Sequence, residues 1–281
     1  MKRNNGTITI EPNERVTFGM RYESDELIVV DKPAGVVTQP GVGHEHDTLL
    51  NGLWASYEKQ LRQLGASRDW GLVHRLDRQT SGLVAVALSQ RMYDAMRAAF
   101  AERRVRKHYW AVCLKRPEQP DGVIRRPIFE QVKRKDKYTS EKKAILSAEG
   151  KPAITAYRTL QASDTAALIE ARPVTGRLHQ VRVHLASIGA GILGDQVYGP
   201  RRTSGAAARV ALHAWRLVLP VGADEEIDVR SPMPRDMRRL LRLHDLEPPS
   251  ASKRVPSEHG GDEVARDPVG EEDAAVGEDP T

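Results

Sequence analysis

Residues 74–83, HRLDRQTSGL, place one carboxylate among basic residues directly ahead of an apolar run. Asp77 stands between Arg75 and Arg78, and nearby cations favour the charged form of a carboxyl group. Asp77 should therefore stay ionised at neutral pH, and the arginines could bind an anionic substrate. The strand-like run 83–88 that follows would hold the carboxylate steadily. From these residues alone a turn aspartate is the competing interpretation, because Asp ahead of Thr, Ser and Gly is common in turns.

Four further blocks of sequence stand in order along the chain on either side of this stretch. They read ESDELIVVDKPAGVV from residue 23, KHYWAV from residue 107, TGRLHQVRVHLASIGAGILGDQVYG from residue 175 and RVALHAWRLVLP from residue 209. Together the five blocks closely resemble the RluA-type pseudouridine synthases. One matching block could be chance, whereas five in the same order span most of the body of the chain and identify it as similar to that family.

The resemblance implies a fold and a reaction. The expected fold is α+β, a single catalytic domain around a mixed, largely antiparallel sheet. The expected reaction cuts the bond between ribose C1′ and uracil N1, turns the bound base and joins C1′ to C5. This isomerisation of uridine to pseudouridine in structured RNA requires no cofactor and no metal, and none is expected here. Large-subunit ribosomal RNA is the first expected substrate, and transfer RNA the second.

Two other functions stay open at this point. A non-catalytic RNA-binding or ribosome-assembly protein could keep the same fold, although binding alone would not require the residues that the resemblance makes catalytic. A glycosidase that uses Asp77 is disfavoured, because no acid partner is placed to protonate a leaving group.

The resemblance assigns roles to individual residues. Asp77 becomes the catalytic carboxylate, which attacks C1′, stabilises positive charge there or abstracts a sugar proton. Arg177 in TGRLHQ should pair with Asp77, and Tyr109 in KHYWAV should lie against the uracil and assist removal of the C5 proton. Arg75 would enter the stack in place of an expelled nucleotide, because a uridine inside a helix must be flipped out before C1′ can be reached.

The charge of the chain is unevenly distributed. The formal net charge is +5, but residues 248–281 hold nine acidic residues against three basic ones, so the remainder is more basic than the total suggests. A basic body suits a polyanion, since each neutralised phosphate releases counterions. The basic residues expected to contact RNA are Lys32, Arg75, Arg78, Arg103, Arg104, Arg106, Lys107, Lys133, Arg134, Lys135 and Lys137.

Composition divides the chain into three parts. Residues 1–20 form a polar leader, 21–247 the catalytic domain, and 248–281 an acidic tail without apolar periodicity that should be disordered. No separate small RNA-binding domain is expected ahead of the catalytic one. Cys113 is the only cysteine, which excludes a disulfide framework, and no apolar stretch approaches the roughly 20 residues of a membrane span. Without a secretory signal, the expected location is the cytoplasm and the expected state a monomer.

Periodicity predicts the main elements. Residues 27–31 and 209–219 read as strands, 151–160 and 166–171 as a strand pair, and 47–64 as a helix capped by Asp47. Ser89 should cap a second helix. Six cations crowd residues 133–143, which predicts an exposed flexible loop.

A further helix is predicted from Gly176 to Gly189. Its apolar face would hold Leu178, Val181, Leu185 and Ile188, and its polar face Arg177, Gln180 and His184. The apolar face would pack against the body of the protein, and the polar face could take part in the chemistry.

Overall fold

Nine strands form one sheet in the part of the chain that the structure describes. The computed structural model describes residues 3–4, 7–8, 10–134, 140–199 and 207–249. The sheet contains β3 (Gly19–Glu23), β4 (Leu27–Lys32), β5 (Ser81–Ala87), β6 (Arg106–Cys113), β7 (Asp121–Arg125), β10 (Ile154–Ala162), β11 (Ala167–Pro173), β12 (Leu212–Pro220) and β13 (Glu226–Arg230).

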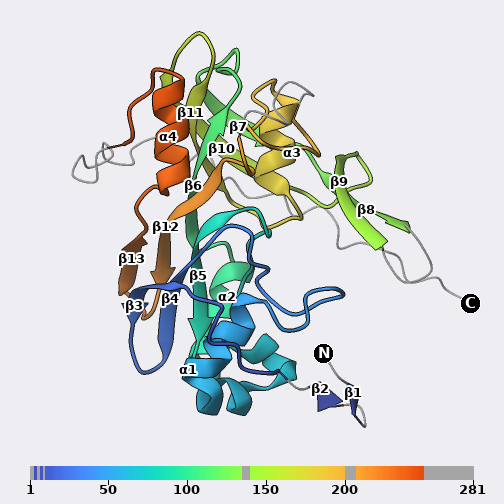
Figure 1. Ribbon diagram of the computed structural model, residues 1–281, viewed down its shortest axis with the longest axis vertical. Helices are drawn as coiled ribbons and strands as arrows, with labels where there is room; N and C mark the ends of the chain where they lie inside the picture. Colours follow the sequence, from blue (N-terminus) through green and yellow to red (C-terminus); the bar gives the residue numbers. More distant parts are fainter. Residues whose placement is uncertain (1–2, 5–6, 9, 135–139, 200–206, 250–281) are drawn as a thin grey trace, which may run out of the picture.

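The sheet is mixed and largely antiparallel. Its order is β3-β4-β5-β12-β6-β11-β10-β7, with β13 paired to β12 (Figure 1). Only the β12–β5 pair is parallel; the other pairs in this sheet are antiparallel. The predicted α+β class is therefore confirmed, and so is the antiparallel pair that β10 and β11 form.

Four α-helices and a 3-10 helix accompany this sheet in the described residues. They are α1 (Leu49–Leu64), η1 (Ala66–Gly71), α2 (Gln90–Ala101), α3 (Gln180–Ser187) and α4 (Arg235–Leu243). Two small hairpins lie apart from the sheet: β1 (Arg3–Asn4) with β2 (Thr7–Ile8), and β8 (Ile128–Arg134) with β9 (Ser140–Leu146). Figure 1 shows the β8–β9 hairpin projecting from the body beyond α3.

Helices α1 and α2 cover opposite faces of the first half of the sheet. On β4, Leu27 and Val29 belong to the hydrophobic cluster that contains residues of α2, whereas Ile28 and Val30 belong to the cluster that contains residues of α1. Successive side chains of a strand point to opposite faces, so the alternation places one helix on each side. All residues of the neighbouring β5 are buried as a result.

The predicted cap of α1 is wrong by one residue. The Thr48 side chain accepts a hydrogen bond from the Asn51 backbone, and the Asn51 side chain accepts one from the Thr48 backbone, which together form a capping box. Asp47 is engaged elsewhere, because its carboxylate lies 2.9 Å from the His44 ring. Ser89 caps α2 as predicted.

The cation-rich stretch is largely a hairpin, not a loop. Residues 131–134 belong to β8 and 140–143 to β9, which pair in antiparallel register. Pairing places Lys133 and Arg134 on one strand and Lys142 and Lys143 on the other. Residues 135–139 between the strands, and with them Lys135 and Lys137, lie outside the described residues.

The helix predicted from Gly176 begins later than its periodicity indicated. Residues 175–179 form a turn, and α3 starts at Gln180 because His179 adopts a left-handed conformation with φ of 51°. Arg177 and Leu178 therefore precede the helix. Gln180 and His184 are buried and bonded to neighbouring strands, so the predicted polar face holds α3 against the sheet.

Gly82 lets β5 and β12 approach each other closely. Its φ is 119°, and a Cβ added there would lie 2.2 Å from the Ala214 carbonyl oxygen on β12. Only glycine accommodates both conditions. The loop that carries Asp77 runs directly into β5, so this approach fixes where the loop meets the centre of the sheet.

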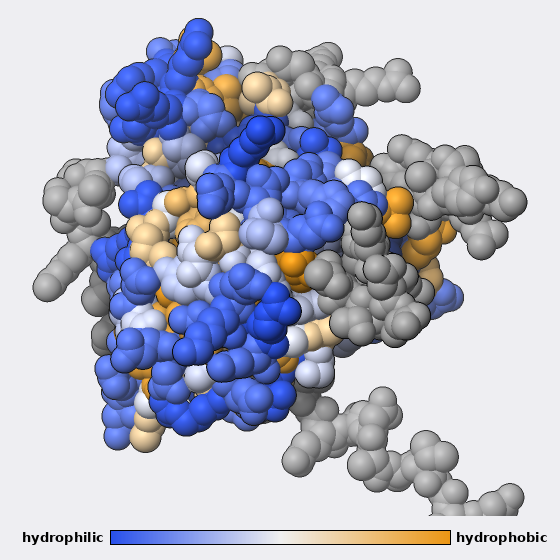
Figure 2. All heavy atoms as spheres, turned by 60° about the horizontal axis from the view of Figure 1, so that its bottom comes forward, coloured by the Kyte–Doolittle hydropathy of each residue, from blue (hydrophilic) through white to orange (hydrophobic). Residues whose placement is uncertain are grey.

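No helix among the described residues is long and apolar enough to cross a bilayer. The face of the molecule in Figure 2 is mainly hydrophilic, and its hydrophobic residues form small separate patches.

The described parts of the 1–20 leader are not all detached from the domain, since Ile10 is buried and the Asn13 N–H donates to the Asn51 carbonyl of α1. The described chain ends at residue 249, so the predicted tail lies almost entirely outside the described residues.

Candidate active site

The loop that carries Asp77 is held on both sides of the aspartate. Before it, the Thr38 hydroxyl donates to the Leu76 carbonyl (2.8 Å) and accepts from the Leu76 N–H (3.2 Å). After it, the Gly35 N–H donates to the Arg78 carbonyl (2.7 Å), and the Arg78 guanidinium donates to the Gly35 carbonyl (3.0 Å). The segment after β4 thus fixes the backbone on which the carboxylate stands.

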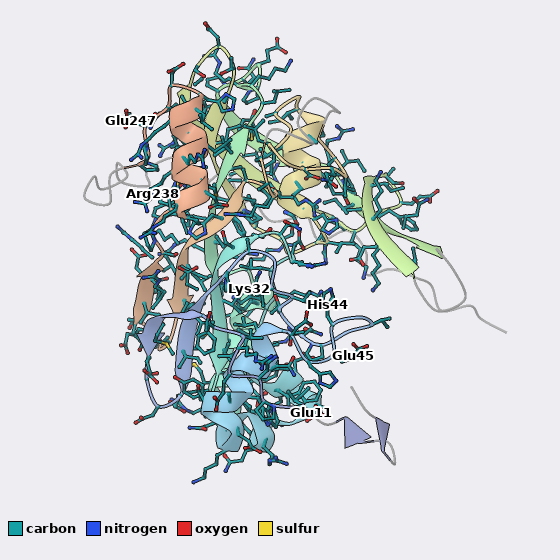
Figure 3. The ribbon with its side chains drawn as sticks, viewed as in Figure 1. Glu11, Lys32, His44, Glu45, Arg238 and Glu247 are labelled. Carbon is teal, nitrogen blue, oxygen red and sulfur yellow. The ribbon has the colours of Figure 1, made fainter. Side chains whose placement is uncertain are left out.

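Lys32 adds a buried anchor, which corrects its predicted contact with RNA. Its side chain is fully buried, and its ammonium group donates to the carbonyls of Pro33 (2.9 Å) and Val36 (2.7 Å), with Arg78 at 3.4 Å. Figure 3 shows Lys32 inside the body of the molecule. Burial lowers the pKa of Lys32 to about 7, against the opposing charge of Asp77. Lys32 therefore shapes the loop and is not accessible to RNA.

We expect Lys32 to make stability depend on pH. The folded pKa is below the unfolded value, so between about pH 7 and 10 the unfolded chain binds a proton that the folded chain does not, and stability should rise with pH. Relative to Lys32→Met, the wild-type free energy of unfolding should gain about 1.4 kcal/mol per pH unit there. Urea unfolding at pH 7.5 and 9 measures this, with exposed Lys59→Met as control. A pH-independent difference would contradict the burial cost.

A cavity of about 1020 Å³ opens beside Asp77. Its wall combines the catalytic loop, β6, the turn before α3, the end of α2 and the β8–β9 hairpin, and it includes Arg75, Tyr109, Arg177 and Lys142. Segments far apart in the sequence therefore meet around one half-buried carboxylate. The volume is in the range of sites that bind small molecules or single nucleotides.

Arg182, and not Arg177, stands beside Asp77. The Arg182 guanidinium lies 3.4 Å from Asp77 and forms two hydrogen bonds with the buried Asp195, at 2.8 and 2.9 Å. Arg177 donates to the Pro152 carbonyl instead. The predicted pairing is therefore wrong, because α3 begins after Arg177 and its first turns carry Arg182 to the carboxylate.

Arg182 remains charged in this setting. Burial alone would lower its pKa, but the hydrogen bonds to Asp195 and the charges of Asp195 and Asp77 raise the pKa of Arg182 overall. One cation thus bridges a buried carboxylate and the carboxylate that faces the cavity. Such a bridge orients Asp77 and keeps positive charge beside it.

His179 is a second neighbour of Asp77. Its Nε2 lies 3.8 Å from the Asp77 carboxylate. Burial lowers the pKa of His179, although the charge of Asp77 opposes the shift. The ring is therefore neutral near pH 7, when it can present either a proton or a lone pair to Asp77.

Tyr109 reaches the cavity from β6, as its predicted role requires. Burial raises the pKa of its hydroxyl, and the charge of Asp77 adds to the rise. The phenol therefore keeps its proton at neutral pH. Lys107, two residues earlier, also lines the cavity, where it donates to the Thr175 carbonyl (3.1 Å) and lies 6.0 Å from the Phe100 ring.

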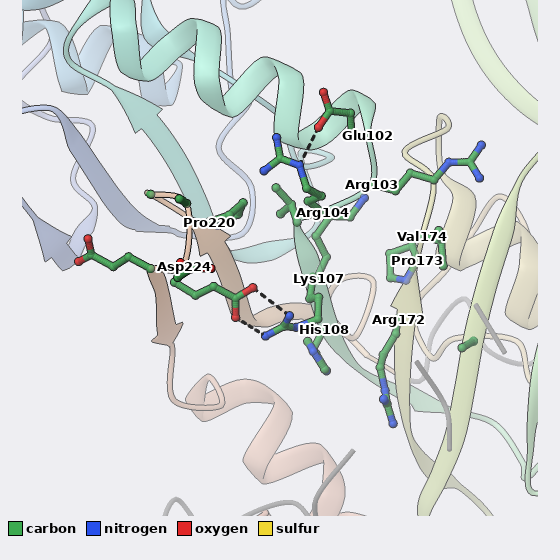
Figure 4. Close-up of a pocket in the computed structure, with 17 residues that line it drawn as sticks. Glu102, Arg103, Arg104, Lys107, His108, Arg172, Pro173, Val174, Pro220 and Asp224 are labelled. Atoms are coloured by element: carbon green, nitrogen blue, oxygen red, sulfur yellow. Dashed lines mark hydrogen bonds and ion pairs between the residues drawn. The ribbon is translucent and has the colours of Figure 1, made fainter. Parts of the chain in front are cut away.

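The predicted phosphate patch at the end of α2 is mostly paired with acids. Figure 4 shows a second cavity, lined by this segment and the β12–β13 turn, in which Arg104 pairs with Glu102. Arg106 in the same wall pairs with Glu226 at 2.8 Å. Arg103 is exposed there with a left-handed backbone. Pairing leaves Arg104 and Arg106 less available to phosphates than their sequence suggested.

Two residues of the site were missed from the sequence. Arg182 and His179 both lie in the 175–199 block. A helix that begins at Gly176 would not place Arg182 on the polar face, so Arg182 was not predicted as a site residue. The spacing of the apolar residues does not indicate that the helix starts only after His179. Arg75 and Arg78 are exposed near Asp77, as an RNA contact requires, while the side chains of Lys133 and Arg134 lie outside what the structure describes.

Comparison with known proteins gives consistent matches. A model of the RNA pseudouridylate synthase family matches residues 26–187. The ribosomal large subunit pseudouridine synthase D of Nitrosomonas europaea is 37% identical over 249 residues, covering 86% of this chain and 69% of that protein. Its namesake from Zymomonas mobilis is 36% identical, covering 83% and 74%. The structure of human RNA Pseudouridylate Synthase Domain Containing 4 has a TM-score of 0.63 at 27% identity, covering 83% of this chain and 95% of that one.

The family match and the site coincide. The matched residues 26–187 include the loop that anchors Asp77, the aspartate itself, Tyr109 and the turn with α3. The likeness to the two bacterial proteins extends over most of the chain. The chain therefore belongs to the RNA pseudouridylate synthase family, in its RluA-type branch, and is an RNA pseudouridine synthase, an isomerase.

Proposed function

We propose that this enzyme isomerises specific uridines of large-subunit ribosomal RNA. The two relatives at 36–37% identity are named for that RNA and support the target. The observation that carries the proposed site is the Asp77 carboxylate, half-buried, bridged to Asp195 by Arg182 and facing the cavity that Tyr109 lines. A fixed anion next to a bound ribose is what cleavage of the C1′–N1 bond requires.

In the proposed mechanism Asp77 acts at the sugar and Tyr109 at the base. The anion attacks C1′, stabilises positive charge there or removes a sugar proton as the C1′–N1 bond breaks. The freed uracil turns within the cavity and C5 bonds to C1′. Tyr109 lies against the base and assists loss of the C5 proton; because its phenol keeps its own proton at neutral pH, the C5 proton passes on to solvent, and the freed N1 takes up one proton from solvent. Arg182 takes the orienting role expected of Arg177, because it is the guanidinium that lies 3.4 Å from Asp77.

The target uridine must leave its helix to reach this cavity. We propose that exposed Arg75, at the wall of the cavity, fills the vacated position in the RNA stack. Arg78, Arg103, Lys107 and the hairpin cations Lys133, Arg134, Lys135 and Lys137 are proposed to contact the surrounding backbone. The proposal includes a monomer, since one chain supplies the whole cavity, and a cytoplasmic location, where bacterial ribosomal RNA is modified.

Mapping of pseudouridines in cellular RNA, with and without the gene, tests the target. We expect one or a few large-subunit positions to lose pseudouridine when the gene is removed and to regain it when the gene is restored. Loss confined to transfer RNA would show that transfer RNA, and not large-subunit ribosomal RNA, is the substrate. Unchanged RNA throughout would contradict the proposal and favour a binding protein on the same fold.

A further inference from the structure

The hydroxyl of Tyr198 connects the β8–β9 hairpin to the candidate active site. Its oxygen accepts a hydrogen bond from the Ala144 N–H of β9 at 2.8 Å. The same oxygen lies 2.8 Å from Nδ1 of His179, whose Nε2 lies 3.8 Å from Asp77. A line of contacts therefore runs from the backbone of the hairpin to the carboxylate.

The number of hydrogens available indicates which atom donates in each of these contacts. If His179 carried its proton on Nδ1, the Tyr198 hydroxyl hydrogen would have no partner among these atoms, and a bare Nε2 lone pair would face the negative Asp77. If Tyr198 donates to Nδ1, each atom is satisfied and Nε2–H points toward the carboxylate. The second arrangement is favoured because it places a donor, not a lone pair, opposite the anion.

Two further observations show that the arrangement is held in place. His179 has a φ of 51°, a left-handed conformation that costs energy for a residue other than glycine and is found disproportionately at functional sites. The Tyr198 ring lies 5.1 Å from the Arg182 guanidinium and 5.8 Å from the Lys143 ammonium group. The tyrosine is thus fixed by its ring as well as by its hydroxyl.

We propose that Tyr198 and His179 are positioning residues for Asp77. Tyr198 sets the tautomer of His179, and His179 directs its Nε2–H at the carboxylate, which limits the orientations that Asp77 can adopt beside Arg182. The 3.8 Å separation is longer than a hydrogen bond, and a small rotation of the carboxylate toward a bound ribose closes it. The role in turnover rests on the proposed action of Asp77, but the tautomer does not.

Nitrogen NMR of the histidine rings tests the tautomer without any turnover. In protein labelled with ¹⁵N in histidine, the signals absent from His179→Asn identify His179, and asparagine tolerates the left-handed backbone. We expect the Nε2–H tautomer in the wild type and a mixture in Tyr198→Phe. An Nδ1–H tautomer in the wild type would overturn the proposal even if the enzyme makes pseudouridine.

Single-turnover kinetics test the effect on Asp77. Tyr198→Phe keeps the ring contacts and loses the hydroxyl, so the rate should fall about tenfold while RNA affinity stays within about twofold. Tyr157→Phe is the matched control, because it removes a buried hydroxyl that donates to the Gln119 carbonyl on another part of the sheet. The double variant Tyr198→Phe/His179→Asn should be no slower than His179→Asn. Additive losses, or an equal loss in the control, would overturn the proposal.

An independent observation concerns the outer face of α4. Arg235, Arg238, Arg239 and Arg242 are exposed along this helix, while Met237, Leu240 and Leu241 are buried beneath it. Figure 3 shows Arg238 on the outer side of α4. The spacing of three, one and three residues aligns the arginines in one stripe, which spans about 10 Å along the axis.

Several other surface arginines of the described chain are paired with acids, unlike the four of the stripe. Arg62, Arg68, Arg91 and Arg230 each pair with a carboxylate. No described carboxylate pairs with the four arginines of the stripe, and the only acid within α4, Asp236, is bound by Arg209 at 2.6 Å. Four like charges left unpaired side by side destabilise the free helix and suit an anionic partner.

We infer that the α4 stripe binds the phosphate backbone of substrate RNA outside the catalytic cavity. A stripe of about 10 Å matches about three phosphates of one strand. The contact reads no base, so it adds affinity for a long RNA without selecting the uridine. This inference rests on the proposed function only in taking RNA as the partner.

Salt dependence of RNA binding tests the stripe. Changing all four arginines to glutamine should weaken binding of a large-subunit RNA transcript and reduce its salt slope by about two to three units, roughly 0.7–0.9 for each phosphate that is no longer neutralised. The matched control changes Arg62, Arg68, Arg91 and Arg230 to glutamine and should alter the slope by less than about one unit. Equal slopes in the two variants would overturn the inference. So would a difference seen only after residues 250–281 are removed, which would identify the acidic tail as the occupant.

Discussion

Asp77→Asn should give a folded protein that binds its RNA and makes no detectable pseudouridine. Asparagine keeps the size and part of the hydrogen bonding of aspartate but removes the negative charge. The loop is held at Leu76 and Arg78 through backbone atoms, which the substitution does not touch. We expect the rate to fall by a factor on the order of 10⁴ or more, as when a member of a catalytic set is removed.

Turnover, unfolding and RNA binding should be measured on the same preparation. Asp94→Asn is a matched control, since Asp94 also pairs with an arginine, Arg68, but lies outside the cavity. The control should keep nearly wild-type activity. An Asp77→Asn protein that still isomerises uridine would exclude the anion from the mechanism, while loss of turnover with binding retained would exclude a protein that only binds.

The fold could be predicted where local pattern and burial agree. The run 27–31 is apolar throughout its first four residues, which are buried on both faces in β4, and Ser89 marks the start of α2 as expected. The cation-rich stretch could not be predicted in this way. Its charges favour an exposed loop, whereas its structure is decided by cross-strand pairing in β8 and β9, which joins residues as far apart as Ile128 and Leu146.

The site could be predicted as a set of segments but not as a set of contacts. The block around Asp77 and the block around Arg177 do meet at one cavity. Which arginine faces the carboxylate depends on where α3 begins, and that depends on the backbone of His179, a single torsion that periodicity cannot register. The sequence predicts Lys32 as an RNA contact. Its burial could not be predicted, because it depends on the segment that folds over it.

Arg182→Lys should lower turnover about 100-fold or more, whereas Arg177→Lys should stay within about threefold of the wild type. Lysine keeps the charge but cannot form two hydrogen bonds with Asp195 and also reach Asp77, as the planar guanidinium does. The Arg177 guanidinium donates to the Pro152 carbonyl and not to a carboxylate, so Arg177→Lys serves as the matched control. The reverse ranking would restore Arg177 as the partner of Asp77.

A double variant that removes the charges of both Arg182 and Asp195 separates the catalytic role of Arg182 from its role in folding. Arg182→Leu leaves Asp195, only 1% exposed, without its cation, and an unpaired buried charge costs about 3–5 kcal/mol. In Arg182→Leu/Asp195→Asn that charge is gone, and the asparagine oxygen can still accept the Val197 and Tyr198 N–H groups. We expect the double variant to recover much of the lost unfolding free energy and little of the turnover. If turnover returned together with stability, Arg182 would act through the fold, and Asp77 would need no neighbouring cation.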